Sequence, residues 1–191
     1  MDSKIEYHDR WNFPRLTIAS SLIDNDLGYA TSGALSASFC LSKFDFKPSY
    51  SKTLTILDYG CGTGRVSRPL TPLFKKVIAF DPSSECIKLL KEENEKCKGL
   101  SDYTFVNMIA TSDPNEIPEC DVAICINVIE HLKEEDAEIL IGILKKKVKG
   151  EVLVAYNQKV KNIINRYLTQ EQIEEDANGA AVRLIDFRKN I

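Results

Sequence analysis

The feature that most constrains the fold is a run of alternate glycines within residues 57–70, LDYGCGTGRVSRPL. The apolar run TLTILDY at 53–59 leads into Gly60, Gly62 and Gly64, and a stretch that can form a helix follows them. Glycine adopts backbone angles that other residues avoid, and it lets a ligand lie directly against the main chain. The spacing therefore predicts a turn from a first strand into a first helix, with a ligand at the turn.

Downstream of this turn, apolar runs alternate with helical stretches. The runs that we interpret as strands are TLTILDY (53–59), KKVIAFD (75–81), YTFVNMI (103–109), CDVAICIN (120–127) and EVLVAY (151–156). Residues 83–96 and 134–147 carry apolar side chains at helical spacing. Nearly all-apolar strands joined by helices indicate a doubly wound α/β domain with a mostly parallel sheet, whose ligands bind beyond the carboxyl ends of the strands.

The length and composition fit one such domain. With 191 residues, 43% of them hydrophobic, the chain can bury a sizeable core over 1–191. We expect a helical extension or lid over 1–50, a ligand-binding core over 51–157, and a C-terminal part over 158–191. In that last part, TQEQIEEDANG (169–179) predicts a helix that ends at a glycine, and AVRLIDF (181–187) predicts an edge strand.

Charge and cysteine usage narrow the class of protein. A formal net charge of -3 gives no general attraction to nucleic acid or to an anionic membrane. We find no signal-peptide core and no apolar run near the roughly 20 residues of a membrane span. The six cysteines form no Cys-x-x-Cys pair, and only His8 and His131 accompany them, so we expect free thiols in the cytoplasm and no zinc site.

An acidic residue stands at the position that makes the glycine turn informative. Asp81 ends the second apolar run, about 20 residues after the turn, where a carboxylate can accept hydrogen bonds from both ribose hydroxyls. The pair predicts a nucleoside-containing ligand. The alternative is a tight turn only, with Asp81 and Ser83 or Ser84 capping the next helix. A nicotinamide dehydrogenase is disfavoured, because its Gly-x-Gly-x-x-Gly fingerprint needs glycine where Arg65 stands.

Four segments resemble motifs of the class I S-adenosylmethionine-dependent methyltransferases. LDYGCGTG (57–64) resembles their motif I, and VIAFDPS (77–83) resembles the second motif. DVAICINVIEHL (121–132) resembles the fourth, and VKGEVLVAY (148–156) resembles the strand after it. The resemblance implies a Rossmann-like methyltransferase fold, S-adenosyl-L-methionine as cofactor and S-adenosyl-L-homocysteine as product.

The same resemblance implies cofactor contacts at each motif. Asp58 would lie near the methionine ammonium, and Asp81 would hold the ribose diol. The full set of implied cofactor contacts is Asp58, Gly60, Cys61, Gly62, Gly64, Asp81, Pro82, Ile109, Asn127 and Val128. Many members also carry an acid after the third strand that binds the adenine amine. Here that position falls near Ile109, so we expect backbone groups at Ile109 and Ala110, or the side chains of Asn107 or Ser112, to replace it.

Glu130 and His131 are the candidate catalytic residues. Methyl transfer needs a general base only when the acceptor must lose a proton, and a histidine can titrate near neutrality. The alternative is that both residues open the helix after the fourth strand, where a glutamate suits the helix dipole. Residues 127–131 also resemble the Glu-x-x-Glu-His metal site of small-RNA 2′-O-methyltransferases, but Asn127 replaces the first ligand and no later histidine follows. We therefore expect no metal.

The flanking segments bear on the acceptor. In the family, the N-terminal extension roofs the acceptor site, which here offers Tyr7, His8, Arg10, Trp11, Phe13 and Arg15. The competing interpretation is that the aromatic residues pack a helix on the sheet. After the fifth strand, on the reactive side, Lys159, Lys161 and Arg166 are too few charges to bind a phosphate backbone well, so we favour a small-molecule acceptor over nucleic acid. A cofactor-binding module without turnover is the third alternative. The family's closing pair of strands hardly fits, which would leave a sheet edge for a homodimer.

Overall fold

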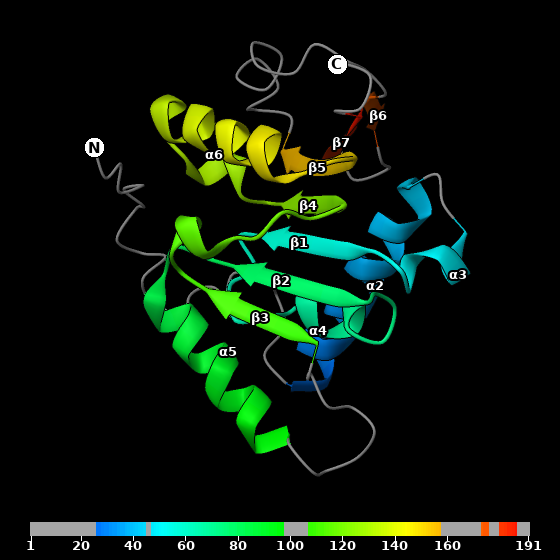
Figure 1. The fold of residues 1–191 in the computed structure, drawn as a ribbon, viewed down its shortest axis with the longest axis vertical. Coiled ribbons are helices and arrows are strands. Elements are labelled where there is room, and N and C mark those ends of the chain that lie inside the picture. Colours follow the sequence, from blue (N-terminus) through cyan, green and yellow to red (C-terminus); the bar gives the residue numbers. More distant parts are fainter. Residues whose placement is uncertain (1–25, 45–46, 98–106, 158–172, 176–179, 187–191) are drawn as a thin grey trace.

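The computed structural model describes residues 26–44, 47–97, 107–157, 173–175 and 180–186. The helices there are α2 (Asp26–Lys43), α3 (Pro48–Ser51), α4 (Ser67–Leu70), α5 (Ser84–Cys97) and α6 (Glu134–Lys147), with 3-10 turns η2 (Pro114–Glu116) and η3 (Ile129–His131). The strands are β1 (Thr55–Tyr59), β2 (Lys76–Phe80), β3 (Met108–Thr111), β4 (Val122–Ile126), β5 (Glu151–Asn157), β6 (Ile173–Glu175) and β7 (Ala180–Asp186). Figure 1 shows the strands side by side with helices on both faces.

The described strands form one sheet in the order β3-β2-β1-β4-β5-β7-β6. β1 pairs in parallel with β2 and with β4, so the chain winds outward in both directions from the middle of the sheet. Among the described strands, β7 alone runs opposite to the rest, so its pairings with β5 and β6 are antiparallel. This is the predicted doubly wound architecture, and it places a topological switch point between the carboxyl ends of β1 and β4.

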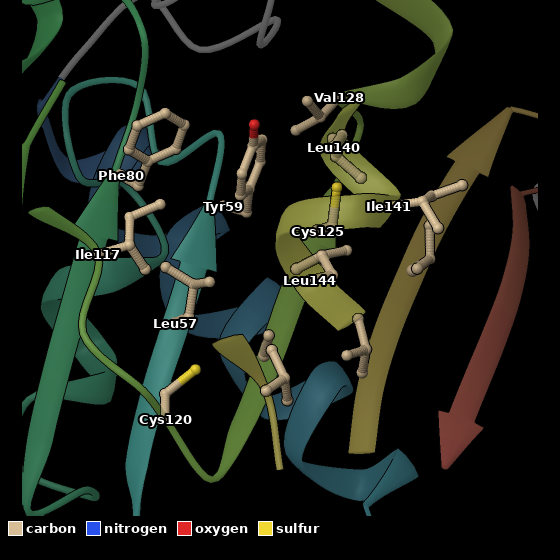
Figure 2. Close-up of a cluster of buried hydrophobic side chains, with 14 of the residues drawn as sticks. Leu57, Tyr59, Phe80, Ile117, Cys120, Cys125, Val128, Leu140, Ile141 and Leu144 are labelled. Atoms are coloured by element: carbon tan, nitrogen blue, oxygen red, sulfur yellow. The ribbon is translucent and has the colours of Figure 1, made fainter. Parts of the chain in front are cut away.

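Alternation along the strands divides the core between the two faces of the sheet. Leu57, Tyr59 and Phe80 point to the face covered by α6, together with Val128 just after β4 (Figure 2). Ile56 and Val77 point to the other face, which α2 and α4 cover. The helix α5 packs on that same second face, since its Leu90 contacts Ala79, which lies two residues along from Val77.

Two expectations about strands were wrong. β3 is described over Met108–Thr111, so it ends two residues later than the expected 103–109, because the buried Thr111 still pairs with Phe80. The helix expected over 169–179 is replaced, at 173–175, by β6, which pairs with β7. Pairing with a neighbouring strand outweighs the local helix preference of this glutamate-rich segment. The closing pair of strands is therefore present, and β6 covers the edge that β7 was expected to expose.

Candidate active site

The glycine turn lies at the carboxyl end of β1 and is built from left-handed backbone. Gly60, Gly62 and Gly64 have φ values of 82°, 55° and 87°. A Cβ on Gly60 would lie 2.2 Å from Val128 Cγ2, and one on Gly64 would lie 2.4 Å from Leu90 Cδ1. The sequence needs glycine at these two positions twice over, for the backbone angle and for the close packing.

Cys61 stabilises the glycine turn through its main-chain hydrogen bonds and its buried side chain. Its amide donates to the carbonyl oxygen of Phe80 at 3.0 Å, and its own carbonyl oxygen accepts from the amide of Gly64 at 2.9 Å. The thiol packs with Ala79 and Leu90 beneath α5. The main-chain amide and carbonyl groups of Cys61 are thus paired within the protein, and so are the amides of Gly60 and Gly62, which donate to Phe80 and Asp81.

Asp58 is a buried carboxyl group at the same edge of the sheet. It is 3% exposed, and Ser67 Oγ donates to its Oδ2 at 2.5 Å. Burial raises the pKa of Asp58 to about 6, although the hydrogen bond from Ser67 and the nearby charge of Arg65 lower it. A carboxylate held in this way gains stability from any cation that comes to lie beside it.

Asp81 joins the glycine turn to the start of α5. Its Oδ2 accepts from the amide of Gly62 at 2.8 Å, and its Oδ1 accepts from the amide of Ser83 at 2.9 Å. The helix cap itself is Ser83, whose Oγ accepts from the amide of Cys86 at 3.3 Å. Burial raises the pKa of Asp81, while its two amide partners lower it. The residue predicted to partner the glycine turn therefore contacts it directly, beside a half-buried Pro82.

The segment after β4 forms the opposite wall of the switch point. Asn127 is exposed and has a φ of 53°, a left-handed angle that asparagine tolerates better than most residues. Val128 is buried against Gly60. Both predicted residues of this segment therefore lie at the same edge as the glycine turn.

Glu130 and His131 lie in the 3-10 turn η3, not at the start of the following helix. α6 begins only at Glu134, after the N-cap Lys133, so the interpretation that the pair opens this helix was wrong. Glu130 Oε2 is buried and has no hydrogen-bond partner among the described residues. Burial raises the pKa of Glu130. A buried carboxyl oxygen without a partner is unfavourable unless something else pairs with it.

The expected adenine contacts are where the structure departs most from the sequence analysis. Ile109 pairs with Ile78 inside β3, short of the carboxyl edge. Asn107 lies at the other end of that strand, where its Nδ2 donates to the carbonyl oxygens of Thr71 and Phe74 at 2.8 and 3.0 Å. The residues that follow β3 are Ser112 and the exposed Asp113. An acid does follow the third strand, and misplacing the strand end by two residues hid it.

Several other expectations lie outside the described residues. These are the aromatic and basic residues of 7–15, the basic residues Lys159, Lys161 and Arg166, and the connections around β6. Within the described part of the chain, no three His, Cys, Asp or Glu side chains are gathered as metal ligands would be. Over the same residues, no helix has the length and apolar character needed to cross a membrane.

Comparison with known proteins identifies the domain. Residues 56–149 match a family model described as a methyltransferase domain. The ubiquinone biosynthesis O-methyltransferase of Rhodopseudomonas palustris (strain BisA53) is 36% identical over 98 residues. That match covers 50% of this chain and 38% of the relative, so the chain spans well under half of the relative's length.

Solved structures share the fold at low identity. The PH0226 protein of Pyrococcus horikoshii OT3 superimposes with a TM-score of 0.67 at 17% identity, covering 95% of this chain and 99% of that one. Magnesium protoporphyrin IX methyltransferase of Synechocystis PCC 6803, solved with bound S-adenosylmethionine, superimposes with a TM-score of 0.58 at 15% identity. It covers 84% of this chain and 79% of that one. Both likenesses confirm the architecture of the sheet and its helices.

Proposed function

Because the chain carries a class I S-adenosylmethionine-dependent methyltransferase domain, we propose that it transfers a methyl group from S-adenosyl-L-methionine to a small molecule. A hydroxyl oxygen is the acceptor that we favour, since the relative described above is named as an O-methyltransferase. The observation that carries the proposal is the contact of Asp81 with the amide of Gly62, which joins the ribose-binding acid to the glycine turn.

The residues at the switch point suit the parts of this cofactor. Asp81 keeps free lone pairs on both carboxylate oxygens for a ribose diol, because each oxygen accepts only one described hydrogen bond. Asp58 offers a buried negative charge to the methionine ammonium. Gly60 lets Val128 pack directly against the turn. Ser112 and Asp113 replace Ile109 as our proposed contacts for the adenine amine.

The cofactor, when bound, supplies a methyl group already activated by its sulfonium, so the protein's tasks are alignment, exclusion of water and proton removal. We assign proton removal to Glu130, whose buried Oε2 is unpaired within the described chain. Burial raises the pKa of Glu130, which makes its carboxylate a stronger base than an exposed glutamate. His131, in the same turn, is the second candidate.

Cofactor binding is tested with a matched pair of variants. Asp81→Asn removes the carboxylate from the proposed ribose site. Asp121→Asn alters an aspartate whose Oδ2 likewise accepts from a backbone amide, that of Thr55 at 2.7 Å, but at the amino end of β1. By calorimetry, S-adenosylmethionine should bind the wild type and Asp121→Asn alike, and Asp81→Asn at least about 10-fold more weakly. Binding of NAD in place of S-adenosylmethionine would refute the cofactor assignment.

Turnover is tested separately. Wild type and Asp81→Asn are incubated with S-adenosylmethionine labelled in the methyl group and with cell extract, which is then divided into small metabolites, nucleic acid and protein. We expect label in the small-molecule fraction only, and none with the variant. Label in nucleic acid would refute the small-molecule acceptor. Cofactor binding without label in any fraction would favour a binding module without turnover.

We also propose a cytoplasmic location, supported by the six cysteines, all of which are free thiols.

A homodimer through the C-terminal sheet edge remains a proposal with weaker support. β6 has only three residues, Ile173–Glu175, and offers a short edge for pairing. Sedimentation at several protein concentrations would test it, and a monomer throughout would refute it.

A further inference from the structure

The helix α2 (Asp26–Lys43) contacts the glycine turn at residues other than the one that Asp81 holds. The hydroxyl groups of Tyr29 and Thr63 are hydrogen-bonded at 2.5 Å. Arg65 Nη1 donates to Ser32 Oγ at 3.3 Å and to Ser36 Oγ at 3.1 Å. These side chains of α2 recur at helical spacing, so they share the face of the helix that rests on the turn.

Main-chain packing brings α2 even closer to the turn. Gly33 is buried on the same helical face, and a Cβ at this position would lie 2.0 Å from the carbonyl oxygen of Arg65. The obstructing atom belongs to the backbone, so it cannot move aside as the end of a side chain could. The helix therefore approaches the turn at a distance that only glycine permits.

The glycine turn needs such support because of its composition. Three glycines in five residues give the segment a large backbone entropy when it is not held in place. A ligand that has to order the segment binds more weakly, because part of its binding free energy offsets that loss of entropy. Contacts from β2 and its loop already fix one side, through Phe80 for Gly60 and through Asp81 for Gly62. Thr63, the residue between Gly62 and Gly64, is held by Tyr29.

We propose that Tyr29 and Arg65 are positioning residues, through which α2 holds the glycine turn in the conformation that binds the cofactor. Neither residue has to touch the cofactor for this role. The proposal rests on the proposed function for the identity of the ligand. The ordering of the turn can be measured without any ligand.

The first test is a double-mutant cycle between Tyr29 and Thr63. Tyr29→Phe and Thr63→Val each remove one hydroxyl of the pair, and each should speed amide hydrogen exchange at residues 62–64 of the free protein by about 3- to 10-fold. The double variant should show no further increase. Affinity for S-adenosylhomocysteine should fall by a similar factor. Tyr50→Phe, at an exposed tyrosine of α3, is the matched control and should change neither quantity.

A second test compares glycine-to-alanine replacements in two helices, only one of which contacts the turn. Gly142 lies within α6 with open space around its Cβ position, so Gly142→Ala should stabilise the protein through helix propensity. Gly33→Ala makes the same change in α2 but pushes the helix from the turn. It should weaken S-adenosylhomocysteine binding and speed exchange at 62–64, whereas Gly142→Ala should leave both unchanged.

The outcomes separate the proposal from the function on which it rests. Wild-type protein that does not bind S-adenosylhomocysteine would refute the proposed function, while the exchange measurements would still decide the role of α2. Unchanged exchange at 62–64 in Tyr29→Phe, or additive effects of Tyr29→Phe and Thr63→Val, would overturn the role of Tyr29. Arg65→Gln should speed the same exchange, and an unchanged rate would remove Arg65 from the proposal.

Discussion

Replacing Asp58 by Asn should stabilise the protein above neutral pH while weakening cofactor binding. Burial raises the pKa of Asp58 from 3.8 to about 6, more than the hydrogen bond from Ser67 and the charge of Arg65 lower it. Between these two pH values the folded protein therefore binds more protons than the unfolded chain. The contribution of Asp58 to stability is complete below pH 3.8 and is lost as the pH rises through about 6.

The rise in pKa from 3.8 to about 6 corresponds to about 3 kcal/mol of unfolding free energy. An asparagine at this position stays neutral at every pH and does not incur this loss. The unfolding free energy of Asp58→Asn minus that of the wild type should therefore increase by about 2 to 3 kcal/mol between about pH 4 and pH 8. Taking the difference cancels the titration of the groups that do not interact with Asp58; Asp81, whose charge raises the pKa of Asp58, is not one of them.

The assay is urea denaturation of both proteins, without cofactor, at a series of pH values. Calorimetry at about pH 8 should show that Asp58→Asn binds S-adenosylmethionine about 10- to 100-fold more weakly, because a hydrogen bond to a charged group is lost. Ser67→Ala removes the hydroxyl that lowers the pKa of Asp58, so the pKa should rise further in this variant. The stability that this variant loses with rising pH should therefore be lost up to a higher pH than in the wild type. If the wild type and Asp58→Asn show parallel stability curves across this pH range, the reasoning is wrong.

Three further predictions follow from single residues. Asn127 has a left-handed backbone, so Asn127→Gly should keep or raise the stability measured by urea denaturation, and Asn127→Val should lower it by about 1 to 2 kcal/mol. Equal stabilities of the two variants would show that the backbone at this position is not strained. Asn107→Ala should cost about 1 to 3 kcal/mol and leave cofactor affinity unchanged, since its amide pairs with carbonyl groups far from the site; weaker cofactor binding at equal stability would contradict this. In a rate–pH profile, turnover by the wild type should fall as the pH drops through the raised pKa of Glu130. Glu130→Gln should be slow at every pH while it binds the cofactor normally. Wild-type rates in that variant would exclude Glu130 as the base.

The order of strands and helices could be predicted from the sequence because each element carries its own signal. The apolar and polar residues of 134–147 alternate at helical spacing, and α6 has those same bounds. Asp81 was predicted to lie beside the glycine turn from its place at a strand end and its spacing of about 20 residues, since parallel strands bring their carboxyl ends to one edge. Local patterns of this kind need no knowledge of distant partners.

The remaining features depend on partners that are distant in the sequence. β3 ends at Thr111 because of its pairing with Phe80, and that pairing, which no local pattern reveals, places Asp113 after the strand. The hydrogen bond between Tyr29 and Thr63 joins residues that are 34 positions apart. The sequence does contain a run of small residues at 30–38, ATSGALSAS, which permits close packing against another element. The run does not indicate which element packs there.

Two unfavourable features of this fold lie at one edge of the sheet. The buried charge of Asp58 and the left-handed Asn127 both lie at the carboxyl ends of β1 and β4. At the opposite end, Asp121 accepts from the amide of Thr55, and the side-chain amide of Asn107 donates to two backbone carbonyl oxygens. Strain at the switch point is expected where a ligand compensates for it, which supports binding but does not by itself require turnover. Glu130→Gln distinguishes the two by experiment, because slow turnover with normal cofactor binding is expected only if the chain is an enzyme that uses this carboxylate as a base.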